Sequence, residues 1–148
     1  MLPHPKSTVK PASVKRPFAV TLLVIEVLIF TGLNVFRCLS AFRYWDFLSS
    51  IAISVSPLYL ALSGALWFLI GSALIWMIWR GQPSAPKMLR GFSAIYGLYY
   101  WADRWLLTAS ILKERWPFAL IMTGFGLVFV FLVLTRPKVT KFFLRRVQ

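Results

Sequence analysis

The sequence is poor in acidic residues and in side chains that carry chemistry. Among its 148 residues there are four Asp or Glu, one histidine and one cysteine. The histidine, His4, lies in a proline-containing N-terminal segment, which excludes a haem or a His/Cys zinc site built on an ordered imidazole. The lone Cys38 excludes an internal disulfide and CxxC redox chemistry.

Motifs for catalysis are missing as well. The sequence has no phosphate loop, dinucleotide fingerprint, nucleophile elbow or metalloprotease helix motif. A Ser–His–Asp triad needs an ordered histidine, and aspartyl chemistry needs two facing carboxylates, for which only Glu26 and Asp103 are available at membrane depth. We therefore expect no enzyme, no catalytic residue, no metal site and no cofactor.

Apolar and basic residues dominate what remains. Apolar residues make up 59% of the chain, the formal net charge is +13 and the mean hydropathy is +0.72. A soluble domain needs a more polar surface, and a disordered basic chain lacks this apolar content. The basic residues flank apolar runs and form no nucleic-acid-binding motif, so we expect no nucleic-acid partner.

The apolar runs predict an all-α integral membrane protein, a four-transmembrane-helix bundle over residues 17–135. About 20 apolar residues cross a bilayer core of about 30 Å. The spans are expected at about 17–37, 57–79, 90–112 and 117–135, and the third is the weakest because Asp103 and Arg104 interrupt it. Between the first two spans, Tyr44, Phe47 and Ile51 recur at helical spacing, which predicts a short amphipathic interfacial helix at about 41–55.

The distribution of basic residues predicts the orientation. With four spans, 12 basic residues lie on the side of both termini and 4 on the other. The positive-inside rule then places both termini in the cytoplasm, with the bundle in the cell membrane. Three spans would carry the basic C-terminal segment across, which the rule disfavours. The chain would thus have a flexible basic N-tail (1–16) and a basic C-tail (136–148).

The basic tails also predict contacts with anionic lipids of the cytoplasmic leaflet, worth about 1 kcal/mol per basic residue near the surface. Phe142, Phe143 and Leu144 lie among basic residues and suggest a lipid-surface anchor. The lipid bilayer is the expected partner, with a homo-oligomer or a larger membrane complex as further possibilities. The candidate lipid contacts are Lys15, Arg16, Lys138, Lys141, Arg145 and Arg146.

Polar residues inside the spans are the candidate site. Glu26, Asn34 and Arg37 share one stripe of the first span, and Asp103 and Arg104 lie in the third. Unpaired charges at membrane depth cost at least ~2.5–3.5 kcal/mol each, which predicts the pairs Glu26–Arg104 and Asp103–Arg37 or Asp103–Asn34. Such pairs fix the register of the bundle; alternatively, Glu26 binds a proton or a substrate in a cavity.

Two functions are compatible with these features. The first is a non-catalytic accessory, assembly or scaffolding subunit of a membrane complex. The alternative is a small oligomeric proton-coupled transporter that uses Glu26. The mid-membrane glutamate in IEV (25–27) and the aromatic segment AIYGLYYW (94–101) resemble the small multidrug resistance transporters, whereas Arg104, the long outer segment and both basic tails depart from that pattern.

Overall fold

The computed structural model describes residues 16–50, 56–107 and 116–144, and every regular element in these ranges is a helix. The predicted all-α class is therefore confirmed for these ranges. Predictions for 1–15, 51–55, 108–115 and 145–148, including those for Lys15, Arg145 and Arg146, lie outside the described residues. The helices are α1 (Phe18–Arg43), α2 (Trp45–Ser50), α3 (Pro57–Arg80), α4 (Ala85–Leu107), α6 (Trp116–Thr135) and α7 (Pro137–Leu144).

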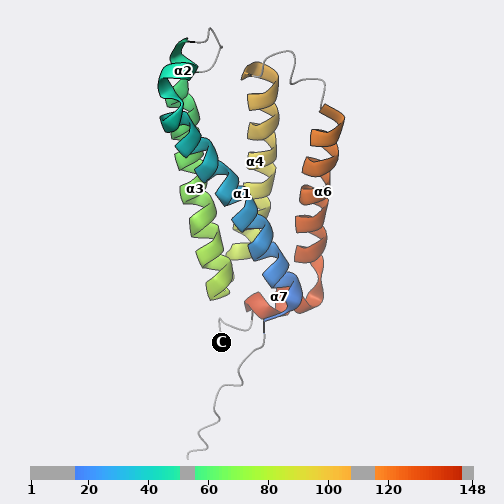
Figure 1. The fold of residues 1–148 in the computed structure, drawn as a ribbon. Coiled ribbons are helices and arrows are strands. Elements are labelled where there is room, and N and C mark those ends of the chain that lie inside the picture. Colours follow the sequence, from blue (N-terminus) through green and yellow to red (C-terminus); the bar gives the residue numbers. More distant parts are fainter. Residues whose placement is uncertain (1–15, 51–55, 108–115, 145–148) are drawn as a thin grey trace, which may run out of the picture.

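Three of the four long helices, α1, α3 and α6, are long and apolar enough to cross a membrane. The fourth, α4, has similar length but does not reach this apolarity over the described residues. It nevertheless runs beside α6 for most of the height of the bundle, with α1 crossing in front (Figure 1). The structure is thus an all-helical bundle with three helices that could span a bilayer.

The limits of α3 follow from local chemistry. Pro57 occupies the first turn, where a missing N–H costs no helical hydrogen bond, and the Ser56 hydroxyl accepts a 3.3 Å bond from the Leu58 N–H. At the other end Gly81 adopts φ 64°, a left-handed conformation that glycine tolerates, and its N–H donates to the Ile78 carbonyl at 3.0 Å. Both ends of α3 are therefore capped.

Two glycines bring α3 against α1. A Cβ on Gly64 would lie 2.8 Å from the Asn34 carbonyl oxygen and 2.9 Å from the Cys38 nitrogen, and one on Gly71 would overlap the Thr31 hydroxyl. Small residues permit such close approach of membrane helices, where packing replaces the hydrophobic effect as the source of association. These two glycines of the second predicted span thus pack within the chain.

The C-terminal segment differs from its prediction. Residues 137–144 form α7, in which Val139, Phe142 and Phe143 are 1%, 4% and 2% exposed and belong to the main hydrophobic core. The interpretation of Phe142 and Phe143 as lipid anchors is therefore wrong. Their helix has one apolar face, and the lower end of the bundle offers it an apolar surface. Lys138 and Lys141 face outward.

The upper end also has different boundaries from those expected. Residues 41–43, assigned to an interfacial helix, continue α1, and Ala41 is buried. Within the described residues, the separate helix α2 covers Trp45–Ser50.

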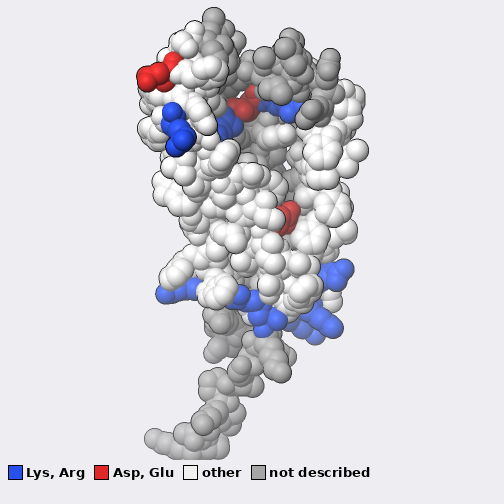
Figure 2. Space-filling view, in the orientation of Figure 1, with Lys and Arg blue, Asp and Glu red and all other residues white. Residues whose placement is uncertain are grey.

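Charges separate along the bundle. Figure 2 shows blue atoms gathered at the lower end, red and blue at the upper end, and a red group recessed in the white band between them. The described basic residues of the lower end lie at the helix ends there: Arg16, Arg80, Lys87, Arg90, Arg136, Lys138 and Lys141.

Gly64→Ala tests the contact between α1 and α3. Because its Cβ would meet backbone atoms that cannot rotate away, we expect a loss of about 1–3 kcal/mol in unfolding free energy. Reversible unfolding in mixed micelles measures it. Gly32→Ala, in open space on α1, is the matched control and should not destabilise. Equal stability of the two variants would contradict the packing described.

Candidate functional site

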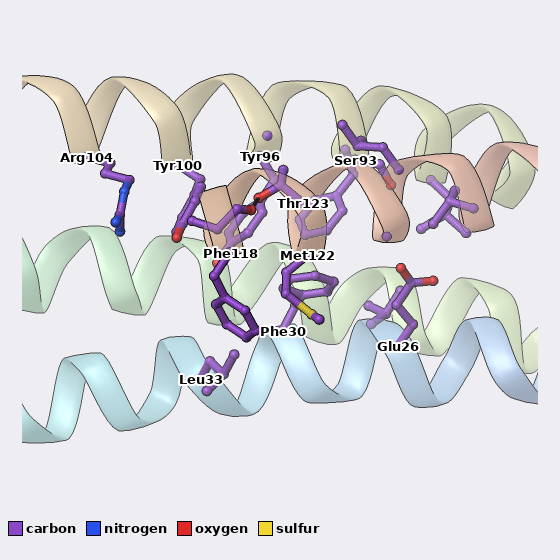
Figure 3. A pocket seen from close by; sticks show the side chains of 18 residues that line it. Glu26, Phe30, Leu33, Ser93, Tyr96, Tyr100, Arg104, Phe118, Met122 and Thr123 are labelled. Carbon is purple, nitrogen blue, oxygen red and sulfur yellow. Dashed lines mark hydrogen bonds between the residues drawn. The ribbon is translucent and has the colours of Figure 1, made fainter. Parts of the chain in front are cut away.

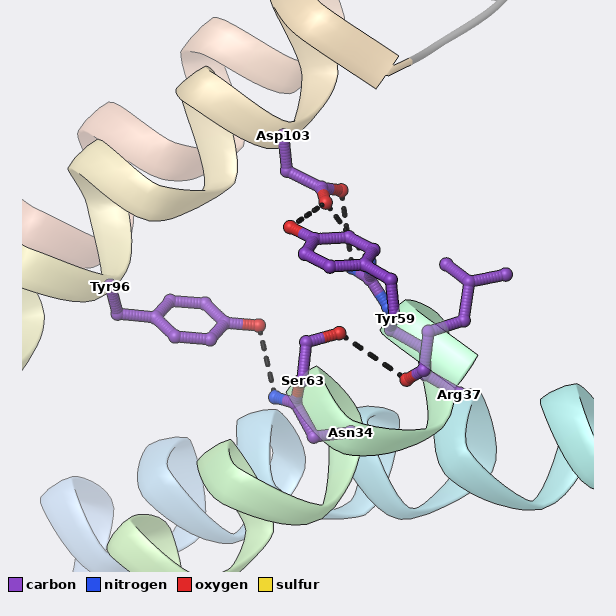
Figure 4. Close-up of polar contacts among 7 residues, drawn as sticks. Asn34, Arg37, Tyr59, Ser63, Tyr96 and Asp103 are labelled. Atoms are coloured by element: carbon purple, nitrogen blue, oxygen red, sulfur yellow. Dashed lines mark hydrogen bonds and ion pairs between the residues drawn. The ribbon is translucent and has the colours of Figure 1, made fainter. Parts of the chain in front are cut away.

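The predicted polar residues fall into two groups, and the first is an ion pair at the upper end. The Arg37 guanidinium donates through Nη1 and Nη2 to both carboxylate oxygens of Asp103, at 3.1 and 3.0 Å. The Tyr59 hydroxyl donates to Asp103 Oδ1 at 2.8 Å. These residues come from α1, α4 and α3, so one carboxylate connects three helices (Figure 4).

A second polar contact joins α1 to α4 lower down. The Asn34 amide donates to the Tyr96 hydroxyl at 3.0 Å (Figure 4). It also donates to the Phe30 carbonyl at 2.8 Å. The Tyr96 ring contacts Trp67 edge-on, with centroids 4.9 Å apart. The amide therefore sits among aromatic rings from three helices and fixes their register.

The surroundings of Arg37 also favour a structural role for this group. Its guanidinium carbon lies 5.8 and 5.9 Å from the ring centres of Tyr59 and Tyr99, within cation–π range. Its charge is balanced by Asp103, and both side chains are largely shielded, at 25% and 19% exposure. A neutral, bidentate pair of this kind leaves little charge to offer a ligand.

The second group is a cavity of about 470 Å³ between α1, α4 and α6. Its walls are mainly apolar and aromatic, with Phe30, Tyr96, Tyr100 and Phe118 among them (Figure 3). Glu26 lines the lower part, and its Oε2 is buried without a hydrogen-bond partner among the residues that the structure describes. The cavity therefore contains a carboxylate oxygen that no described residue satisfies.

Gly126 on α6 makes room for that carboxylate. A Cβ at this position would lie 3.2 Å from Glu26 Oε1 and 3.8 Å from the tip of the Phe30 ring. At Gly124, one half-turn away on the same helix, a Cβ would meet nothing within 4 Å. Gly126 thus leaves space for the Glu26 carboxylate, which a side chain at position 126 would crowd.

The expected pair between Glu26 and Arg104 is not formed. Both residues line the cavity, but Figure 3 shows them at opposite ends. The cause is helix register: α4 begins at Ala85, earlier than the predicted start near 90, so Arg104 lies about 28 Å along α4 whereas Glu26 lies about 12 Å along α1. Arg104 instead borders a second hollow formed with Trp101, Trp105 and Trp116.

A carboxylate in this position is unusual because burying its charge costs free energy. A charge at membrane depth costs at least ~2.5–3.5 kcal/mol unless it is paired, hydrated or neutralised. The cavity leaves space for a counter-group, and its lining includes aromatic rings, a side-chain type whose π face attracts cations. Protonation or a bound cation would each lower this cost.

The candidate lipid contacts have different surroundings. The Arg16 guanidinium donates to the Trp79 carbonyl at 2.9 Å, and its carbon lies 4.2 Å from the centre of the Trp79 ring. These contacts cap the end of α3. Lys138 and Lys141 are exposed on α7. Tyr59, Tyr96 and Gly126 were not predicted as site residues, because their roles depend on which helices become neighbours.

Comparison with other proteins gives no assignment. No protein-family model, curated protein or solved structure matches this chain. Among the described residues, no three His, Cys, Asp or Glu side chains gather as a metal site. The site must therefore be interpreted from its own geometry.

Asp103→Ala tests the structural role of the ion pair. It leaves Arg37 shielded without its partner, so we expect a loss of about 2–3 kcal/mol in unfolding free energy, below the ~3–5 kcal/mol of a fully buried pair. The double variant Arg37→Met/Asp103→Leu removes both charges and should be more stable than Asp103→Ala in the same mixed-micelle unfolding. If the double variant unfolds with no larger free energy than Asp103→Ala, the pair does not stabilise the register of the bundle.

Proposed function

We propose that this chain is a four-span protein of the cell membrane, with α4 as the fourth span and both termini in the cytoplasm. The length of α4, its place beside α6 and its ion pair with α1 support this count. The excess of basic residues at the lower end supports the orientation, since positive charge is retained on the cytoplasmic side. The helix α2, which begins at Trp45 and is preceded by Tyr44, would then lie at the outer interface.

Single cysteines test this topology in a Cys38→Ser background. Four spans predict that a membrane-impermeant maleimide reaches Ser84→Cys only from the cytoplasmic side, and Ser50→Cys and Trp116→Cys only from outside; all three positions are exposed. The measurement compares intact cells with inside-out vesicles. Labelling of positions 84 and 116 from the same side would exclude α4 as a span.

We further propose that the protein binds a lipophilic organic cation at Glu26 and exchanges it for a proton, as a small membrane transporter does. The observation that carries this proposal is the buried, unpartnered Glu26 Oε2 in an apolar cavity. The cavity volume of about 470 Å³ lies in the range of small-molecule sites, roughly 300–1,000 Å³. A cation and a proton compete for the same negative charge, which couples the binding of one to the release of the other.

The cavity favours this role over that of an accessory or assembly subunit. A scaffold needs only helix contacts, and the Arg37–Asp103–Tyr59 group and the glycines of α3 are sufficient for those. A carboxylate without a hydrogen-bond partner contributes nothing to such helix contacts. Exposed Lys138 and Lys141 on α7 would meet anionic headgroups of the cytoplasmic leaflet, which holds the bundle at a fixed depth.

Glu26→Gln tests the binding role. It keeps the shape of the side chain and removes its charge, so the affinity of the purified, reconstituted protein for tetraphenylphosphonium should fall about ten-fold or more, at ~1.4 kcal/mol per factor of ten. Wild-type affinity should fall as the pH is lowered, because protons compete for Glu26, and this dependence should vanish in the variant. Equilibrium dialysis measures both.

Two controls separate binding from folding. Asp46→Asn removes an exposed acid on α2, outside the cavity, and should bind normally. Gly126→Val should weaken binding by displacing Glu26, whereas Gly124→Val on the same helix should not. Loss of folding in Glu26→Gln, or equal binding by Glu26→Gln and wild type, would contradict the proposal.

A further inference from the structure

The cavity has a side opening between α1 and α6. Three of its lining residues on these helices, Leu33, Phe118 and Met122, are 59%, 66% and 52% exposed. In Figure 3, Leu33 lies on α1, and Phe118 and Met122 project from α6 in front of the cavity. We call these three residues the mouth of the cavity.

The lower end of the cavity is closed. Val27, Leu89 and Val130 line it there and are 2%, 1% and 3% exposed. All three belong to the same core cluster as Phe142 and Phe143 of α7. A ligand at Glu26 is therefore separated from the lower aqueous side by packed side chains.

The inclination of α1 explains why the opening lies at the mouth. Low in the bundle α1 reaches α6, where Glu26 and Phe30 approach Gly126. Higher up it packs tightly on α3 at Gly64, and Figure 1 shows it leaning away from α6 toward α3. The two helices that border the mouth therefore diverge toward the upper end, and side chains of α4 form the back of the opening.

The surroundings of the mouth are those of a lipid-facing surface. Both bordering helices are among the candidate membrane spans, and the mouth residues lie within them. The neighbouring exposed side chains are apolar too, such as Ile29 and Phe36 on α1 and Phe125 on α6. In a bilayer, such a surface contacts hydrocarbon.

We propose that the ligand enters this cavity sideways from the bilayer, between α1 and α6. The substrates are then cations that partition into membranes, and a small hydrophilic cation of the same charge is excluded. This inference rests on the proposed binding role of Glu26 and adds the route by which the lipophilic cation reaches it.

Photolabelling of the full-length protein in liposomes tests the route. A lipid-soluble aryl diazirine inserts into side chains that face hydrocarbon, and mass spectrometry locates the insertions. We expect labelling at Leu33, Phe118 and Met122, reduced two-fold or more by saturating tetraphenylphosphonium. Leu69 on α3 is the matched control, since it is 63% exposed and does not line the cavity, and its labelling should not change.

The outcomes separate the route from the binding role. Labelling at Leu69 without labelling at the mouth, or tetraphenylphosphonium that binds without protecting the mouth, would overturn lateral entry and leave the binding role intact. Failure of tetraphenylphosphonium to bind at all would overturn the proposed function and this inference with it. In Glu26→Gln, labelling of the mouth should persist but protection should be lost.

The class of ligand has its own test. Along a series from tetramethylammonium through methyl- to butyl-triphenylphosphonium, apparent affinity on the aqueous concentration scale should rise in step with membrane partitioning. Within the phosphonium pair, affinity on the membrane concentration scale should change less than two-fold. Tight binding of tetramethylammonium would overturn the proposed class.

Discussion

The close contact between α1 and α3 determines the shape of this bundle. At Gly64 and Gly71 the two helices approach until a single methyl group would collide with α1. Because α1 follows α3 in its upper part, it cannot also follow α6, and the space that it leaves becomes the cavity beside Glu26. Tight packing on one side of α1 thus produces an opening on the other.

The charged residues within the long helices have different surroundings for the same reason. Where α1, α3 and α4 converge, Arg37 and Asp103 form a bidentate pair that balances their charges, and the Tyr59 hydroxyl donates a further bond to Asp103. Where α1 and α6 meet below the opening, Glu26 has no cation in the protein within reach to form an ion pair among the described residues. Its carboxylate therefore has no counter-ion among these residues.

The sequence predicted the helices themselves better than it predicted which of their residues meet in the bundle. The all-helical class, the positions of α1, α3 and α6, and the contact of Arg37 with Asp103 follow from apolar length, proline positions and the cost of unpaired charge. Glu26 was identified as a candidate, but its pairing with Arg104 was wrong, because a start of α4 misplaced by a few residues shifts the register by several ångströms.

Other features could not be obtained from one sequence. The contribution of Tyr59 depends on how α3 is rotated against α4, and that of Gly126 depends on which helix faces Glu26. The burial of Phe142 and Phe143 depends on an apolar surface that exists only once the bundle has formed. Each depends on tertiary packing, which the local periodicity of the sequence does not reveal.

The central claim is that Glu26, in contrast to the other intramembrane charges, holds a cationic ligand. Solid-state NMR measures this directly as dipolar dephasing between the phosphorus of bound tetraphenylphosphonium and glutamate carboxyl carbons labelled with carbon-13. The chain has two glutamates, Glu26 and Glu114, so Glu114→Gln leaves a single signal. The account predicts that the phosphorus dephases the Glu26 carboxyl signal. A saturated sample without such dephasing would contradict it.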